Sequence, residues 1–286
     1  MTKILVTGSN GQLGSELRDL AGGYPDHEFL FTDIAELDIT DEQAVRHYFL
    51  REKPAAVINC AAYTAVDKAE DDPESAYALN ALAAGFLARA SNSAGALMIA
   101  LSTDYVFNGK AGQPITEEDP PEPGSVYGST KLEGERAVAS NAGRAVIIRT
   151  SWLYSSHGHN FVKTILKYAR ERGVLNVVND QYGSPTYARD LAAVILDLLP
   201  GWQQTAGTEI FNYSNGGTAT WYEFAKEILA LKGVPCLVNP VTTDLYPTRA
   251  ARPAYSVLST EKIRNRFRIV IPGWKESLTE CLKKIE

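Results

Sequence analysis

The chain has 286 residues, of which 45% are hydrophobic and 22% charged, as in globular proteins generally. This composition excludes disordered, collagen-like and fibrous chains. The net charge is −6 and basic residues form no run, which argues against nucleic acid as a partner, because neutralised phosphates supply most of that affinity.

Between residues 1 and 150, short apolar segments alternate with longer segments of helical periodicity. Strands are predicted at Lys3–Val6, His27–Thr32, Ala55–Cys60, Leu97–Ser102 and Ala145–Thr150. Helices are predicted at Gln12–Ala21, Asp41–Arg51, Pro73–Ala94 and Ser129–Asn141. Apolar strands alternating with helices are typical of a parallel sheet covered on both faces. The predicted fold class is therefore α/β, a Rossmann-type doubly wound parallel sheet.

After Thr150 the pattern changes to shorter and more irregular elements. We expect helices at Asn160–Arg172, Arg189–Leu199, Thr220–Lys232 and Gly273–Ile285, a short strand at Glu209–Tyr213, and loops at 176–186 and 241–253. This predicts a smaller, loop-rich α/β lobe, with the chain returning once to the sheet near residues 189–214. The first domain is expected to comprise 1–151 and 187–216, and the lobe 152–186 and 217–286.

The three cysteines, Cys60, Cys236 and Cys281, are too widely spaced for a disulfide framework or a zinc pattern. Cys60 lies in an apolar run, where a small buried side chain is expected. The N-terminus lacks the pattern of a secretory signal, and no apolar run reaches the ~18 residues that span a membrane. We therefore expect a protein of the reducing cytoplasm without a membrane partner.

A glycine-rich turn joins the first predicted strand to the first predicted helix. Its glycines recur at every third position, which a plain strand–helix turn would not need. They allow a tight turn and let the backbone approach a pyrophosphate, which the helix N-terminus can bind. The Gly-Lys-Ser/Thr ending of a triphosphate-binding loop is missing. We predict a dinucleotide site formed by Gly8, Asn10, Gly11, Gln12, Leu13 and Gly14.

Asp33 follows the second predicted strand, about 20 residues beyond the last glycine. A carboxylate at this place accepts hydrogen bonds from an adenosine ribose and repels a 2′-phosphate. No Arg or Lys lies between Arg18 and Arg46, although a residue distant in sequence, such as Arg18 or Lys68, can fold near the site. This favours NADH, and we expect the protein to use NADH at least as well as NADPH. The alternative is a loop or helix-capping acid.

Tyr127 and Lys131 are four residues apart on a predicted helix and so share one face. A phenol has a pKa of about 10, too high for efficient proton transfer near neutrality, and a nearby cation lowers that pKa. Thr103 follows a predicted strand, at the carboxyl end where ligands bind in parallel sheets. We predict Tyr127 as the proton donor, with Lys131 as the cation and Thr103 as a hydroxyl partner. The alternatives are a surface helix pair and a turn that ends the strand.

These residues resemble the extended short-chain dehydrogenase/reductase family, and most closely its dTDP-4-dehydrorhamnose reductases. Besides the glycine turn and Y-G-S-T-K at 127–131, the similar segments are N-C-A-A-Y-T-A-V-D-K-A-E at 59–70, S-T-D-Y-V-F at 102–107, R-T-S-W-L-Y at 149–154, N-F at 160–161, N-D-Q-Y-G-S-P-T at 179–186 and Y-P-T-R-A-A-R-P at 246–253. The similarity covers essentially the whole chain.

The resemblance implies reduction of the C4 ketone of dTDP-4-dehydro-6-deoxy-L-mannose to dTDP-L-rhamnose with NADH or NADPH. It implies a sugar-nucleotide-binding role for the smaller lobe. Besides the glycine turn, Tyr127 and Lys131, it places coenzyme contacts at Asp38, Ile39, Ala62, Tyr63 and Thr64, of which the Asp38–Ile39 match is loose. It places substrate contacts at Thr103, Asp104, Tyr105, Trp152 and Asn160, with Trp152 offering a flat apolar wall to the sugar. Arg249 and Arg252 are further candidates, for the diphosphate, since guanidinium forks match phosphate oxygens.

No metal site is expected, and His157 and His159 are interpreted as turn residues. Some members of the resembling family form a dimer through magnesium held by carboxylates, and Glu16 matches one such position. Arg189 replaces an expected glutamate at another, and a cation there repels Mg²⁺. We therefore expect a monomer or a weak homodimer without a bridging metal.

Two alternative functions remain open from the sequence. One is another sugar-nucleotide reductase, epimerase or dehydratase of the same fold, although dehydratases usually have a Glu after the position of Asp104. The other is a regulatory binding protein similar to the β-subunit of methionine adenosyltransferase. The intact Tyr127–Lys131 pair favours catalysis.

Overall fold

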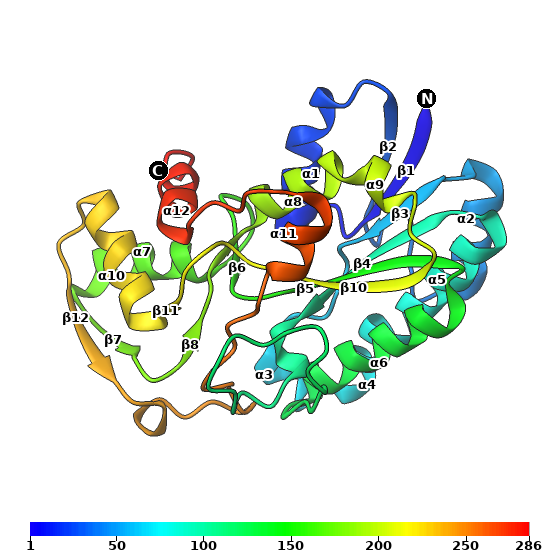
Figure 1. The fold of residues 1–286 in the computed structure, drawn as a ribbon. Coiled ribbons are helices and arrows are strands. Elements are labelled where there is room, and N and C mark those ends of the chain that lie inside the picture. Colours follow the sequence, from blue (N-terminus) through cyan, green and yellow to red (C-terminus); the bar gives the residue numbers. More distant parts are fainter. Residues whose placement is uncertain (286) are drawn as a thin grey trace.

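A six-stranded parallel sheet forms the centre of the protein, in a computed structural model that describes residues 1–285 (Figure 1). Its strands are β1 (Thr2–Thr7), β2 (His27–Thr32), β3 (Ala56–Asn59), β4 (Leu97–Thr103), β5 (Arg144–Thr150) and β10 (Gly207–Tyr213). The spatial order is β10-β5-β4-β3-β1-β2, so the connections run outward in both directions from β1 and β3. The prediction that the chain returns once to the sheet is confirmed, because β10 pairs with β5 from Gly207 to Tyr213.

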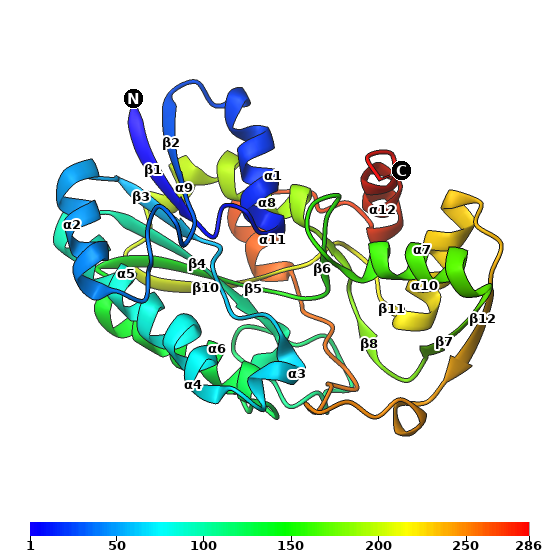
Figure 2. The same cartoon turned by 180° about the vertical axis from the view of Figure 1, so that it is seen from behind.

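Helices cover both faces of this sheet, as the apolar strands predicted (Figures 1 and 2). One face is covered by α1 (Gln12–Leu20), α8 (Ala188–Asp197), α9 (Leu199–Trp202) and α11 (Glu261–Phe267), which contribute buried side chains to one core cluster. The other face is covered by α2 (Glu42–Glu52), α5 (Ala83–Ala94) and α6 (Val126–Asn141), around a second cluster. The fold is the expected doubly wound α/β sheet.

The predicted helix 73–94 is helical along its whole length but contains a π-helical turn. It consists of α4 (Pro73–Tyr77), the π turn η2 (Ala78–Leu82) and α5. Asn80 lies in this turn, and its amide bonds to the backbone N and O of Tyr63 and to the Thr130 hydroxyl. The wider turn therefore places one side chain between the loop after β3 and helix α6.

The remaining elements form a smaller group beside the sheet, with its own core of buried side chains (Figure 1). Its helices are α7 (Phe161–Arg172), α10 (Trp221–Lys232) and α12 (Trp274–Leu282). Short strands pair in twos, namely β6 (Leu153–Tyr154) with β9 (Thr186–Tyr187), β7 (Val174–Val178) with β12 (Leu237–Val241), and β8 (Tyr182–Gly183) with β11 (Ala219–Thr220). Within residues 1–285, no helix has the length and apolar character needed to cross a bilayer.

Several sequence predictions for this region were wrong. The expected loop 176–186 contains most of β7 and all of β8, and the strand β12 precedes most of the expected loop 241–253. Outside this region, the short helix α3 (Val66–Ala69) and helix α11, which packs on the sheet, were not predicted. The strands β7 and β12 pair across more than 60 residues of sequence, and local periodicity carries no signal of such a partner.

Candidate active site

The glycine turn between β1 and α1 is shaped by close backbone packing. Gly8 has a φ of +64°, and a Cβ there would lie 2.5 Å from the backbone N of Ala61. A Cβ on Gly14 would lie 2.5 Å from the carbonyl oxygen of Gly8. Gly11 is the N-cap of α1 and has no side chain to cap it, which leaves the first N–H groups of the helix open toward a ligand. The first and third glycines thus make the turn possible, and the second opens the helix end.

A cavity of about 680 Å³ begins at this turn and extends along the ends of β1, β2 and β3. Of the predicted coenzyme residues it is lined by Gly8, Asn10, Gly11, Asp33, Asp38, Ile39, Ala62 and Tyr63. The loosely matched pair Asp38–Ile39 therefore lies in the wall of this cavity. Gly14 does not line it, in keeping with a packing role.

Asp33 is fixed at the mouth of the turn by two backbone donors. Asn10 N donates to its Oδ2 at 3.0 Å, and Ile34 N donates to its Oδ1 at 2.9 Å. Arg18 lies at the same turn, where its Nη2 donates to the Ser9 hydroxyl at 2.7 Å. A cation distant in sequence from Asp33 therefore folds next to the glycine turn.

A second cavity, of about 590 Å³, adjoins the first, because Gly11, Cys60 and Ala62 line both. It brings together the three predicted catalytic residues, Tyr127, Lys131 and Thr103. Its wall also contains Gln12, Leu13, Thr64, Asp104, Tyr105, Trp152 and Asn160 from the predicted site. Segments from six parts of the sequence, including Trp221, thus meet where the carboxyl ends of β4 and β5 face the smaller lobe.

Thr103 connects the end of β4 to the phenol of Tyr127. Burial raises the pKa of Tyr127, and the nearby Thr103 hydroxyl opposes this effect. The Thr103 hydroxyl also donates to Asp104 Oδ1 at 3.0 Å. Helix α6 begins at the right place for this contact because Ser125 caps it, accepting from the backbone N of Gly128.

Asp104 is a buried carboxylate, and its Oδ2 receives no hydrogen bond from residues 1–285. Burial raises the pKa of Asp104 to about 6, against the opposing effect of the Ser256 and Thr103 hydroxyls. A buried acceptor without a donor at the wall of a cavity is a place for a ligand hydroxyl.

Lys131 is buried beneath Tyr127, one helical turn away. Its Nζ donates to the carbonyl oxygen of Leu101 at 2.7 Å. Burial lowers the pKa of Lys131 to about 8, while Glu135 and Cys60 act in the opposite direction. The sequence suggested that Lys131 acts directly on the phenol, whereas here its bond is to the backbone of β4.

The two candidate arginines differ in position. Arg252 is 19% exposed, its Nη2 lies 2.6 Å from Asp67 Oδ2, and its guanidinium lies 6.0 Å from the Tyr105 ring centre. Arg249 is 62% exposed and pairs with Asp71. Arg252 thus lies beside the second cavity, and Arg249 lies farther out on the surface.

Trp152 lines the second cavity, but one face of its indole is stacked on Trp221, with ring centres 3.5 Å apart. Its φ is +47°, an uncommon value for a bulky residue, and its ring lies against Gly183, where a Cβ would be 2.4 Å from it. Phe161 packs against Trp221 with ring centres 4.6 Å apart. The apolar wall is therefore a group of three aromatic rings, and the sequence analysis missed two of them.

Asn160 caps helix α7 and uses its amide within the protein. Its Oδ1 accepts from Lys163 N, and its Nδ2 donates to Ser155 O at 2.7 Å and Gln12 Oε1 at 3.0 Å. It therefore ties the loop before α7 to the glycine turn.

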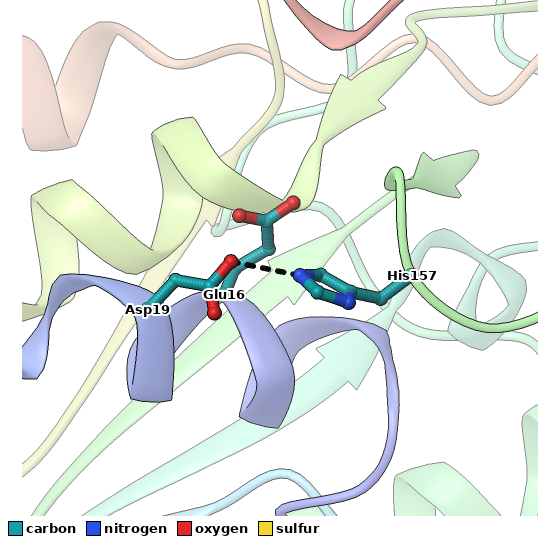
Figure 3. Close-up of side chains that lie close together, drawn as sticks. All are labelled: Glu16, Asp19 and His157. Atoms are coloured by element: carbon teal, nitrogen blue, oxygen red, sulfur yellow. Dashed lines mark hydrogen bonds and ion pairs between the residues drawn. The ribbon is translucent and has the colours of Figure 1, made fainter. Parts of the chain in front are cut away.

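His157 belongs to the same loop and contacts α1 (Figure 3). Its Nε2 lies 2.8 Å from Asp19 Oδ2, and Glu16 lies close by. The carboxylate of Glu16 is already used, accepting from the Ser155 hydroxyl at 2.6 Å and pairing with Arg189 at 3.3 Å. Arg189 therefore lies beside Glu16, the carboxylate that matches a metal-binding position of the resembling family.

The fold and a tyrosine–lysine pair beside a dinucleotide turn define a nicotinamide-dependent oxidoreductase of the short-chain dehydrogenase/reductase class. The chain belongs to the family described as RmlD substrate binding domain, which matches residues 1–286.

Several relatives are similar over nearly their whole length. The spore coat polysaccharide biosynthesis protein SpsK of Bacillus subtilis is 42% identical over 99% of this chain and 98% of that protein. The dTDP-4-dehydrorhamnose reductase of Salmonella typhimurium is 40% identical over 97% of each. Among solved structures, the dTDP-4-dehydrorhamnose reductase of Bacillus anthracis in complex with NADP has a TM-score of 0.94 and 37% identity, over 99% of this chain and 100% of that one. A dTDP-4-dehydrorhamnose reductase from Clostridium acetobutylicum has a TM-score of 0.94 and 43% identity, over 99% of both chains.

Proposed function

We propose that this protein reduces the C4 ketone of dTDP-4-dehydro-6-deoxy-L-mannose to give dTDP-L-rhamnose, with NADH or NADPH as the reductant. Full-length relatives named dTDP-4-dehydrorhamnose reductase support the reaction. The observation that carries it here is the meeting of Thr103, Tyr127 and Lys131 in the cavity that adjoins the dinucleotide cavity.

The reduced nicotinamide supplies the hydride when it is bound. Tyr127 holds the proton for the carbonyl oxygen, and the Thr103 hydroxyl beside it would turn from Asp104 to the phenol and stabilise its anion as the proton leaves. Lys131 carries its positive charge below a pH of about 8. That charge favours the phenolate formed at Tyr127 and can bind the nicotinamide ribose.

The substrate would lie between Asp104 and the aromatic wall. The free Oδ2 of Asp104 is suited to a sugar hydroxyl, and Arg252, held by Asp67 beside Tyr105, is suited to the diphosphate. We assign Trp152 to the apolar wall together with Trp221. Arg249 is the less suitable candidate for the diphosphate, since it is exposed and paired with Asp71. Asn160 orients the loop around the substrate.

Further parts of the proposal concern the organisation of the chain. We assign the coenzyme to residues 1–151 and 187–216, and the sugar nucleotide to residues 152–186 and 217–286. The separate core of the smaller lobe supports this division, except that α11 and the segment after it pack on the sheet although they fall within 217–286. A cytoplasmic location, and a monomer or weak homodimer without a metal bridge, are part of the same proposal.

The test is to incubate the protein with dTDP-4-dehydro-6-deoxy-L-mannose and NADH or NADPH. Oxidation of the reduced coenzyme measures the rate, and the product is then identified. Tyr127→Phe removes the proton donor and is expected to lower kcat by about 10²- to 10⁴-fold. Tyr213→Phe is the matched control, because its buried hydroxyl has no partner within residues 1–285. Coenzyme binding without turnover of this sugar would contradict the proposal and favour a binding protein or a different substrate.

A further inference from the structure

Behind Lys131 lies a charged group that the proposed chemistry does not use. Glu135 follows Lys131 by four residues on α6 and so lies on the same side of the helix. Its side chain is only 5% exposed. Arg149 donates to both carboxylate oxygens, from Nε at 2.9 Å and from Nη2 at 2.7 Å, and the Ser102 hydroxyl donates to Oε1. A carboxylate with three donors is fixed in position.

These contacts tie the helix of the tyrosine–lysine pair to two strands. Ser102 and Arg149 stand opposite one another in the register of β4 and β5. Each precedes the last residue of its strand, and Ser102 is directly followed by Thr103, the partner of Tyr127. Glu135 therefore sets the distance between the helix that carries Tyr127 and the strand that carries Thr103.

Stability alone is a poor reason for this arrangement. Two buried charges lose their hydration, and a well-packed apolar pair of similar volume is often as stable or more so. Arg149 is 3% exposed, its Nη1 has no partner among residues 1–285, and its guanidinium lies 5.0 Å from the Phe107 ring centre. An ion pair kept at this cost next to a catalytic lysine points to a role in the site.

The charges of the pocket give that role. Lys131 is faced by Glu135 and Tyr127 from α6 and by Cys60 from the segment after β3, while Arg149 lies on β5 behind Glu135. With the carboxylate present, one anion interacts with both cations. Without it, two buried cations would remain with no carboxylate to compensate them. An arginine cannot release its proton in a protein, so Lys131 would lose its proton at a lower pH than in the wild type.

We propose that Glu135 is a positioning residue of the active site, which fixes α6 to β4 and β5 and keeps Lys131 positively charged while it faces the coenzyme. The inference rests on the proposed function for the role of Lys131. The opposing effects of burial and of Glu135 on the pKa of Lys131 agree with it. A neighbouring opposite charge shifts a pKa by roughly 1–3 units. Loss of the carboxylate should move the alkaline limb of activity down by about one pH unit.

Glu135→Gln and Arg149→Met form a matched pair, because both break the same ion pair and both are expected to lower the melting temperature. Only Glu135→Gln leaves an uncompensated cation beside Lys131. In a series from pH 6 to pH 10, the kcat/KM of this variant and its affinity for reduced coenzyme should fall at a lower pH than in the wild type. Between pH 6 and pH 8, the decrease should be about fivefold larger in the variant than in the wild type. Arg149→Met should not move this limb downward.

The double variant Glu135→Gln/Arg149→Met guards against a single variant that does not fold, because it removes both buried charges. It should fold, and its alkaline limb should shift downward by less than in Glu135→Gln, because the carboxylate is lost but no second cation is left beside Lys131. Equal shifts in both single variants, or no shift in Glu135→Gln or the double variant, would overturn the inference and leave Glu135 a purely structural residue. Coenzyme affinity is measured without sugar. If the proposed sugar reaction fails, the pH dependence of coenzyme binding still tests the role of Glu135.

Discussion

Replacing Asp104 by asparagine should stabilise the folded protein at neutral pH while weakening its activity. The carboxylate is 2% exposed, accepts one hydrogen bond from Thr103, and has a second oxygen without a donor from residues 1–285. Burial raises its pKa from 3.8 to about 6. The folded state therefore binds a proton more tightly than the unfolded state, so the ionised group destabilises the fold once the pH exceeds these values.

The size of the effect follows from that shift. A raised folded-state pKa makes the Asp104 contribution unfavourable as pH rises through the window from 3.8 to about 6. Above this window the ionised Asp104 lowers the free energy of unfolding by about 3 kcal/mol, at 1.36 kcal/mol per unit of pKa difference. At pH 5 it is about half as large. An asparagine keeps the shape and never ionises, so its advantage should grow by about 1.4 kcal/mol between pH 5 and pH 8.

Urea denaturation of both proteins at several pH values measures this difference directly. Asp180→Asn is the control of opposite sign, because hydrogen bonds from Thr243 lower the pKa of Asp180. The ionised form of Asp180 stabilises the fold, so Asp180→Asn should be less stable than the wild type. The difference in free energy of unfolding should become smaller as pH falls. If the stability difference for Asp104→Asn does not change with pH, Asp104 is not ionised at a cost, and the reasoning fails. Activity should fall in Asp104→Asn, since the proposed sugar contact loses its charge.

Asp33→Ala should change the ratio of kcat/KM for NADPH to that for NADH at least tenfold in favour of NADPH, because a carboxylate that repels the 2′-phosphate is removed and about 1.4 kcal/mol is a factor of ten; a wild type already tenfold better with NADPH would show that Arg18 or another cation outweighs Asp33. Gly183→Ala should cost about 1–3 kcal/mol in denaturation, because the new Cβ would lie 2.4 Å from the Trp152 ring; an unchanged midpoint would mean that the ring can move. Sedimentation in Mg²⁺ and in chelator should agree, since Arg189 pairs with Glu16; a dimer that dissociates on chelation contradicts this.

The sheet and the dinucleotide turn could be predicted from the sequence because their signals are local. The strands of the first 150 residues are short apolar runs between helices of clear periodicity, and the predicted bounds of His27–Thr32 agree with β2. The glycine turn and the Tyr127–Lys131 pair each lie within a few residues of sequence. The resemblance to a known family then named further site residues by position, and most of these line one of the two cavities.

Contacts between distant segments could not be predicted in this way. The stacking of Trp221 on Trp152 joins residues that local patterns treat separately, and so does the ion pair of Glu135 with Arg149. Arg249 and Arg252 have the same side chain three residues apart, and only the fold makes the first exposed and the second mostly buried. The π turn at Asn80 also has no local signature, because it depends on partners in two other segments.

The last strand of the sheet arrives late during synthesis. Until β10 is made, β5 is an edge strand, and its residues Val146, Ile147 and Ile148 are apolar and fully buried in the finished protein. Ribosomes add ~5–20 residues per second, so the roughly 60 residues between the ends of β5 and β10 take about 3–12 s. During that time an apolar edge is open to pairing with other chains. A chain cut short before Gly207 should therefore accumulate as aggregate instead of as a coenzyme-binding fragment.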